Sequence, residues 1–249
     1  MSNRVNLRAI DFEGEKDPDY VDHTDDGDLL GKKTGIRVED SDTLSFTDET
    51  SDKPFSVSFW AQTGDKTDVA EGGAAGGKID FDGQPDGTRA NEYLFTFWPA
   101  NPGGGAPGGK FGLYLYDIDT AAGGNSGAQL RAYVTSTAFI QNNTWHHVVC
   151  TYSGNPDYGA DDSNSALVSS GIKIYFDGQD VTDQATHERV GKYAQMHNRA
   201  GVFSIGAFGS IVDDDPDTGD PKSDLRVFKG KMADMCIFNK ELSAAEAVE

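Results

Sequence analysis

Carboxylates gathered in two short segments are the residues of this chain whose type and spacing could do chemistry. They are Asp80, Asp82 and Asp86 in the first segment and Asp213, Asp215 and Asp217 in the second. Carboxylate oxygens are the ligands that Ca²⁺ prefers, and a glycine such as Gly83 lets the backbone turn so that they converge. The closing glutamate of an EF-hand is missing. We therefore predict a calcium site in at least one acidic segment, with a solvated acidic loop as the alternative.

Aromatic residues near loops are the second group that could bind a ligand. Sugar recognition needs an exposed aromatic surface beside hydrogen-bonding groups, and we select Trp98, Tyr114 and Tyr116 as the glycan-binding candidates. The alternative is that these rings belong to the core, as most aromatic residues in sandwich strands do. The sequence does not specify which sugar would bind.

The five histidines and two cysteines form no recognised catalytic or metal-binding motif. His146 and His147 lie in one apolar segment, where we expect hydrogen-bonded structural residues. Cys150 and Cys236 also lie in apolar segments. Two buried thiols are predicted, and a single disulfide between two strands is the alternative.

Short strand-like segments separated by turns must position these residues. In 144–152 both alternating faces carry aromatic or β-branched residues, which is typical of a central strand and predicts Trp145 and Val149 as core residues. The segment 172–176 ends in Asp177-Gly178, a turn signal. Further predicted strands are 4–12, 34–38, 44–46, 54–62, 92–98, 110–117, 128–136, 201–208, 225–228 and 231–238.

Other segments are predicted to be loops, and one is predicted to be helical. The segment 64–91 has few apolar residues and predicts a long loop. Ser243 and Glu246 have capping-box spacing and predict one or two helical turns near the end of the sequence. Many short strands and almost no helix predict an all-β fold, a two-sheet antiparallel β-sandwich or jelly roll, in a single domain over residues 1–249.

Composition excludes some partners. The 249 residues include 41 acids and 21 bases, a formal net charge of −20 that repels nucleic acid phosphates and anionic lipid surfaces. No segment approaches 18 consecutive apolar residues, so we expect no membrane insertion. The charge also suits a solvated surface in salty surroundings.

Four segments in one order resemble laminin G-like domains of the concanavalin A-like lectin/glucanase superfamily. They are T-W-H-H-V-V-C-T-Y-S-G from residue 144, G-I-K-I-Y-F-D-G-Q-D-V from residue 171, S-I-G-A-F from residue 204, and F-K-G-K-M-A-D-M-C-I-F-N-K-E-L-S-A-A-E from residue 228. Earlier in the chain, P-F-S-V-S-F-W-A-Q and A-I-D-F-E-G are similar to the family's early core strand and opening strand. The resemblance implies a jelly roll of two curved sheets whose loops bind glycans or calcium. It also implies a third candidate calcium site, at Asp234 beside the opening D-F-E-G.

The same resemblance bears on activity. Some relatives are glycosidases that place two glutamates around an aspartate on one strand face. Here Asp117 and Asp119 share a face, but Ala121 takes the third position and no Glu-x-Asp-x-Glu occurs. We therefore predict that the protein is not an enzyme.

The N-terminal residues lack the apolar core of a signal peptide. Because laminin G-like domains normally work outside cells, we expect release as part of a particle. The favoured interpretation is a phage-type virion surface protein, a capsid decoration, knob or fibre-associated protein that contacts other virion or surface proteins and could form an oligomer. The alternative is a calcium-dependent carbohydrate-binding or adhesion module of a secreted or cell-surface protein.

Overall fold

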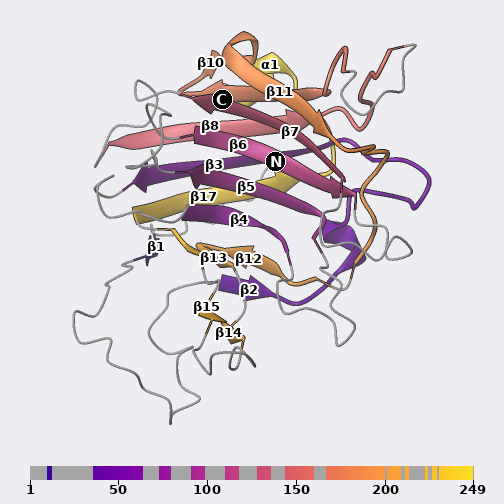
Figure 1. Cartoon of the computed structure of the whole chain (residues 1–249). Coiled ribbons are helices and arrows are strands. Elements are labelled where there is room, and N and C mark those ends of the chain that lie inside the picture. Colours follow the sequence, from indigo (N-terminus) through magenta and orange to yellow (C-terminus); the bar gives the residue numbers. More distant parts are fainter. Residues whose placement is uncertain are drawn as a thin grey trace.

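Two antiparallel sheets pack face to face in the computed structural model of the chain (Figure 1). The structure describes residues 10–12, 36–63, 73–79, 91–98, 110–117, 128–135, 144–159, 167–199, 201–208, 211–212, 222–223, 226–228 and 230–248. The predicted all-β sandwich is confirmed. In the described part of the chain, no helix is long and apolar enough to cross a membrane.

The first sheet has six strands in the order β1-β17-β3-β8-β9-β10. Their bounds are β1 Ile10–Phe12, β17 Gly230–Phe238, β3 Phe55–Thr63, β8 Trp145–Tyr152, β9 Ile172–Phe176 and β10 Gln179–Asp180. The first and last described strands are neighbours, with Asp11 opposite Lys231. Asp177 and Gly178 both have positive φ in the two-residue turn between β9 and β10, as predicted.

The second sheet has seven strands in the order β11-β7-β6-β5-β4-β12-β2. Their bounds are β11 Ala185–Val190, β7 Ala128–Thr135, β6 Lys110–Asp117, β5 Tyr93–Trp98, β4 Gly73–Lys78, β12 Phe203–Ile205 and β2 Ile36–Val38. Two small pairs join β13 Ala207–Phe208 to β16 Arg226–Val227 and β14 Ile211–Val212 to β15 Lys222–Ser223.

The core lies between the sheets, where alternate residues of each strand meet. Phe55, Val57 and Phe59 of β3 are buried on its inner face, as the alternation predicts. Phe59 packs against Phe95 and Phe111 of the opposite sheet, with ring centroids 5.5 and 6.1 Å apart. Each such side chain contributes about 1.5–3 kcal/mol through burial.

Strand β4 lies in a segment predicted to be loop. Glycine and alanine are depleted in strands, so the sequence G-A-A-G-G-K carries no strand signal. The packing requires small residues, because a Cβ at Gly76 would lie 2.7 Å from the Phe95 ring, and one at Gly77 would meet the carbonyl oxygen of Tyr93. The opposite error occurs at 44–46, a segment predicted to be a strand. Leu44 ends the 3₁₀ turn Asp42–Leu44, and Ser45 and Phe46 lie in no strand.

Two predictions about strand residues are wrong. Cys150 is buried, but Cys236 is exposed, and no disulfide joins the two thiols. Cys236 ends a register shift in β17 that begins at Ala233, and Asp234 within this bulge has a φ of 50°. Trp145, predicted as core, is 36% exposed on the outer face of β8.

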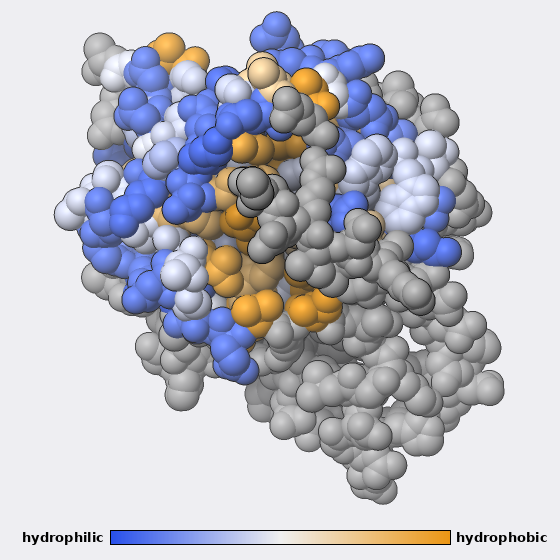
Figure 2. All heavy atoms as spheres, turned by 180° about the vertical axis from the view of Figure 1, so that it is seen from behind, coloured by the Kyte–Doolittle hydropathy of each residue, from blue (hydrophilic) through white to orange (hydrophobic). Residues whose placement is uncertain are grey.

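The outer face of the six-stranded sheet is covered over part of its area by the C-terminal segment. Val149 and Tyr175 are buried there against Leu242 and Ala247. The helical turn α1, Ala244–Ala247, begins with the predicted capping box of Ser243 and Glu246. Seen from behind, hydrophobic residues gather in the middle of the molecule between hydrophilic margins (Figure 2).

Candidate functional site

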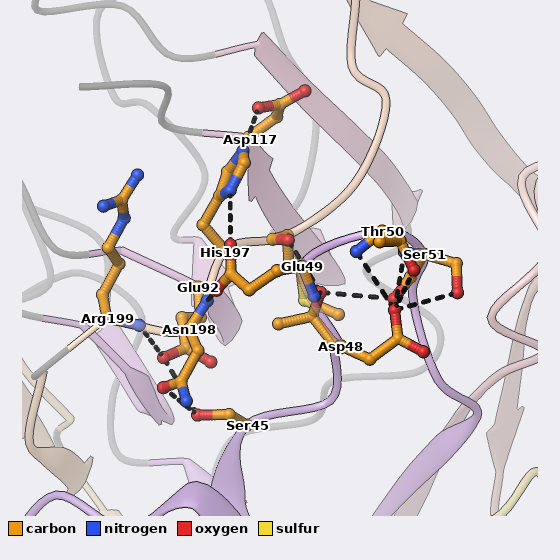
Figure 3. Close-up of polar contacts among 12 residues, drawn as sticks. Ser45, Asp48, Glu49, Thr50, Ser51, Glu92, Asp117, His197, Asn198 and Arg199 are labelled. Carbon is orange, nitrogen blue, oxygen red and sulfur yellow. Dashed lines mark hydrogen bonds and ion pairs between the residues drawn. The ribbon is translucent and has the colours of Figure 1, made fainter. Parts of the chain in front are cut away.

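A cluster of charged and polar residues joins the loop before β3, the ends of β4 to β6 and the segment 191–199 at one edge of the sandwich. We call it the polar edge; its members are Asp40, Ser45, Glu49, Asp52, Lys78, Glu92, Asp117, Tyr152, Tyr193, His197 and Asn198. Part of it is drawn in Figure 3. Its residues are far apart in sequence, so only folding brings them together.

Lys78 and Glu92 form a fully buried ion pair within the polar edge. Nζ of Lys78 lies 2.7 Å from Oε1 of Glu92 and 2.8 Å from Oδ1 of Asp40, and it donates to the Ser45 hydroxyl at 2.5 Å. Oε1 of Glu92 also accepts from the backbone N–H of Arg199 at 2.8 Å. Burial raises the pKa of Glu92, although these donors oppose the shift. The ion pair links Lys78, the last residue of β4, to Glu92, the residue before β5. Removal of either partner would leave the other as a buried charge without this partner.

Asp52 is the second buried carboxylate of the polar edge. Its Oδ2 accepts from the hydroxyls of Tyr152 at 2.6 Å and Tyr193 at 2.7 Å, and its Oδ1 accepts from the backbone N–H of Met196 at 2.7 Å. Burial raises the pKa of Asp52, while these three donors favour the ionised form. The carboxylate thereby ties β8 to the segment 191–199.

His197 lies between two carboxylates in Figure 3. Its Nδ1 is 3.1 Å from Oε2 of Glu49, and its Nε2 is 3.1 Å from Oδ1 of Asp117. Burial disfavours ionisation of Glu49, but the Asn198 N–H and the His197 ring outweigh it and hold the pKa of Glu49 below its usual value. Asp117 is thus engaged in fixing the segment 191–199.

The other described histidines are hydrogen-bonded as well. Nδ1 of His146 lies 2.7 Å from Oδ2 of Asp177, and Nε2 of His147 lies 2.9 Å from Oγ of Ser58. Nδ1 of His187 lies 2.6 Å from a serine hydroxyl. The predicted hydrogen bonding of His146 and His147 is confirmed.

The outer face of the seven-stranded sheet carries an aromatic cluster with charged neighbours, which we call the tyrosine face; its members are Lys110, Tyr114, Tyr116, Arg131, Tyr133 and Glu188. Tyr114 and Tyr133 are stacked with centroids 6.5 Å apart and planes 5° apart. Nζ of Lys110 lies 4.3 Å from the centre of the Tyr133 ring. Strand registry creates the cluster, because Tyr114 stands opposite Arg131, and Arg131 stands opposite Glu188.

Polar contacts fix the tyrosine face. Nε of Arg131 donates to Oε2 of Glu188 at 2.6 Å, and the hydroxyl of Tyr133 donates to Oε1 of the same residue at 3.0 Å. Arg131 and Tyr133 hold the pKa of Glu188 below its usual value, against the effect of burial. The result is a pre-ordered set of aromatic and charged groups, part of it exposed to solvent.

Two of the three sequence-based glycan candidates, Tyr114 and Tyr116, lie on this same sheet face. Tyr116 is half-buried and Tyr114 is buried, while the side chain of Trp98 lies outside the described residues and its backbone pairs with Lys110. Sequence reasoning missed Arg131 and Tyr133. The signal was available, because alternate residues of the predicted strand 128–136 share a face.

A family comparison identifies the fold family. A family model described as concanavalin A-like lectin/glucanases superfamily, of the laminin G type, matches residues 30–248. The chain belongs to this superfamily. The resemblance seen in the sequence is thereby confirmed. None of the curated proteins matches the chain.

Several solved structures are similar to this chain over most of its length. A heptameric SAP-like pentraxin from Limulus polyphemus is 12% identical, with a TM-score of 0.43 over 86% of this chain and 79% of the pentraxin chain. The binding domain of botulinum neurotoxin serotype D is 14% identical, with a TM-score of 0.47 over 86% of this chain and 39% of the neurotoxin chain. The binding domain of botulinum neurotoxin DC, in complex with rat synaptotagmin II, is 12% identical, with a TM-score of 0.48 over 87% of this chain and 39% of the neurotoxin chain. The chain thus spans about two fifths of the neurotoxin domains.

Most predicted calcium ligands of this superfamily member fall outside the described residues. These are Asp80, Asp82, Asp86, Asp213, Asp215 and Asp217. Asp234 is described and exposed in the β17 bulge. Among the described residues, no three histidine, cysteine or acidic side chains are grouped as metal ligands.

Proposed function

We propose that this laminin G-like chain is a non-enzymatic binding module that recognises glycans through the tyrosine face. The observation that carries the proposal is the half-buried, pre-ordered set of Tyr133, Arg131 and Glu188 on the outer face of a rigid sheet. Aromatic rings bind the apolar face of a sugar, while guanidinium and carboxylate groups hydrogen-bond its hydroxyls. Groups already held in place lose little conformational entropy on binding, which favours affinity.

The polar edge supports the non-enzymatic part of the proposal. Catalytic acids and bases must reach a substrate, but the carboxylates of Asp52 and Glu92 are buried, and Asp117 and His197 are bound to each other. In the described residues these groups serve to hold the sandwich together. A glycosidase assay on glycans that bind the protein on a glycan array should therefore show no hydrolysis.

Glycan array binding tests the proposal. The wild-type protein, with calcium present, should bind a subset of glycans, and Tyr133→Ala should lose that binding because its ring is the half-exposed member of the stack. Val168→Ala is the control, because Val168 is 70% exposed and lies outside the tyrosine face. No binding to any glycan by the wild-type protein would refute glycan recognition.

For the biological setting we propose display on a virion surface as a capsid decoration, knob or fibre-associated protein of a phage. The net charge of −20 supports this, because an acidic surface stays solvated and resists association with nucleic acid. Other virion proteins would be the partners. Mass spectrometry of purified particles should detect the chain; a protein found only on the producing cell's surface would favour the adhesion-module alternative.

We also propose that calcium binds at the acidic segments around Asp80 and Asp215 or at Asp234. The carboxylate density of these segments supports the proposal. A site that binds only the folded state adds about 2.7 kcal/mol at a calcium concentration 100-fold above Kd. The melting temperature should therefore rise from EDTA to millimolar calcium, and less so with magnesium. Equal melting temperatures in EDTA and calcium would contradict this.

A further inference from the structure

A second aromatic surface lies on the outer face of the six-stranded sheet. Trp60 in β3 is 40% exposed and Trp145 in β8 is 36% exposed. The His147 ring stacks on Trp60, with centroids 5.1 Å apart and planes 29° apart. We call these three residues the tryptophan platform. It belongs to the opposite sheet from the tyrosine face, so it is a separate surface.

Strand registry explains why the three rings adjoin. Trp60 stands opposite His147, and Trp145 stands opposite Gln62. The two indoles are therefore diagonal neighbours on one sheet face, with Cα atoms about 7–8 Å apart. On its other side Trp60 faces Ala233 of β17, whose small side chain cannot cover an indole. The platform thus stays open beside β17.

The rest of this sheet face shows that the fold can cover apolar residues there. Val149 and Tyr175 are shielded by the C-terminal segment, which Ser56 anchors: its hydroxyl donates to the carbonyl of Lys240 at 2.8 Å and accepts from the N–H of Leu242 at 3.0 Å. Burial of a large apolar side chain stabilises a fold by about 1.5–3 kcal/mol. Trp60 and Trp145 forgo part of that stabilisation, and the exposed part of each indole is available to a ligand.

We propose that the tryptophan platform binds the apolar face of a neutral sugar ring. An indole offers a flat apolar surface, and the Ser58 hydroxyl, which is hydrogen-bonded to Nε2 of His147, has capacity for a further hydrogen bond to a sugar hydroxyl. The net charge and the exposed carboxylates of Asp177 and Asp234 in the neighbouring turn and bulge disfavour an acidic sugar.

Two alternatives fit the platform less well. A protein partner normally covers about 800 Å² per side, far more than three rings provide. A cationic His147 would attract an anionic ligand, but burial lowers the pKa of His147 despite the nearby Asp177 carboxylate. Burial therefore disfavours the cationic form of this ring. A neutral saccharide fits the exposed indoles and their acidic surroundings better than either alternative.

The proposal deepens the glycan-binding function and is tested by NMR of the indole N–H signals. The chain has three tryptophans, so each signal can be assigned with a Trp→Phe variant. Cellohexaose, maltohexaose and chitohexaose are added up to about 10 mM, which nearly saturates a site with a Kd of about 1 mM. At least one of them should shift the signals of both Trp60 and Trp145, and an oligogalacturonate should not.

Variants then separate the two surfaces. Trp60→Ala should weaken binding of that hexasaccharide by about tenfold, or 1.4 kcal/mol, while Val168→Ala should leave it unchanged. If no neutral hexasaccharide moves the two indole signals, the platform proposal is wrong. If glycans still bind and Tyr133→Ala abolishes that binding, the proposed function survives without the platform. If no glycan binds wild-type protein on the array or in solution, both proposals fail.

Discussion

The polar edge and the outer sheet faces use their side chains in opposite ways. At the polar edge, Lys78, Glu92 and Asp52 are buried and directed at one another or at the backbone of neighbouring segments. On the outer faces, Trp60 and Tyr133 present ring surface to solvent. Among the described residues, the charged groups of the polar edge hold neighbouring segments together, whereas the exposed aromatic residues form the surfaces that we propose for binding.

The largest expected effect is at the buried ion pair. Lys78→Ala leaves Glu92 as an uncompensated buried carboxylate and should cost about 3–5 kcal/mol of unfolding free energy, measured by urea denaturation. Lys78→Met combined with Glu92→Leu is the matched control, because it removes both buried charges, leaves only the partly exposed Asp40 without this partner and should recover most of the loss. A loss below about 1 kcal/mol in Lys78→Ala would show that the polar edge is not structural.

Asp52→Ala should have the next largest effect. It removes the acceptor of two tyrosine hydroxyls and one backbone N–H, and each buried donor left unsatisfied costs about 1–3 kcal/mol. We expect a total loss of about 3 kcal/mol in thermal or urea unfolding. Tyr152→Phe deletes one donor only and should cost about 1 kcal/mol. Equal losses in the two variants would contradict a shared acceptor.

A smaller, pH-dependent effect is expected at Glu49. Its pKa is lowered in the folded state, so it stabilises the fold above the usual value of 4.5, and this contribution is lost as the pH falls through the folded-state pKa. Glu49→Gln should lose about 0.5 kcal/mol at pH 7, a discounted value because the side chain is half exposed. The gap to wild type should close below pH 4.5; a gap that widens there would contradict the assignment.

The smallest effect on stability is expected at the tryptophan platform. Trp145 is exposed, so Trp145→Ala should change the unfolding free energy by only about 0.5 kcal/mol. Val149→Ala provides the contrast, because this neighbour on the same strand face is buried beneath the C-terminal segment. A loss of unfolding free energy above about 2 kcal/mol in Trp145→Ala would show that Trp145 stabilises the fold as a core residue does. The tryptophan platform would then be structural, as the polar edge is.

Local patterns alone determined much of this structure. Runs of β-branched and aromatic residues placed strands at 172–176 and 110–117 with the observed bounds, and Asp177-Gly178 marked the observed turn, because both signals depend only on neighbouring residues. The order of four such segments also sufficed to recognise the superfamily. Glycan binding and calcium binding remain predictions, the latter resting on acidic segments that lie largely outside the described residues.

Tertiary structure alone decided which residues are buried and which adjoin. Strand β4 exists because Gly76 and Gly77 permit close approach to β5, a packing requirement invisible in the propensity of its residues. Lys78 became a buried ion partner only because that strand brings it to Glu92. Trp145 is a large apolar residue of the type found in cores, but its side chain lies on the outer face of β8. The two-residue alternation of a strand determines which side chains share a face. Which segment covers that face depends on parts of the chain that are distant in sequence.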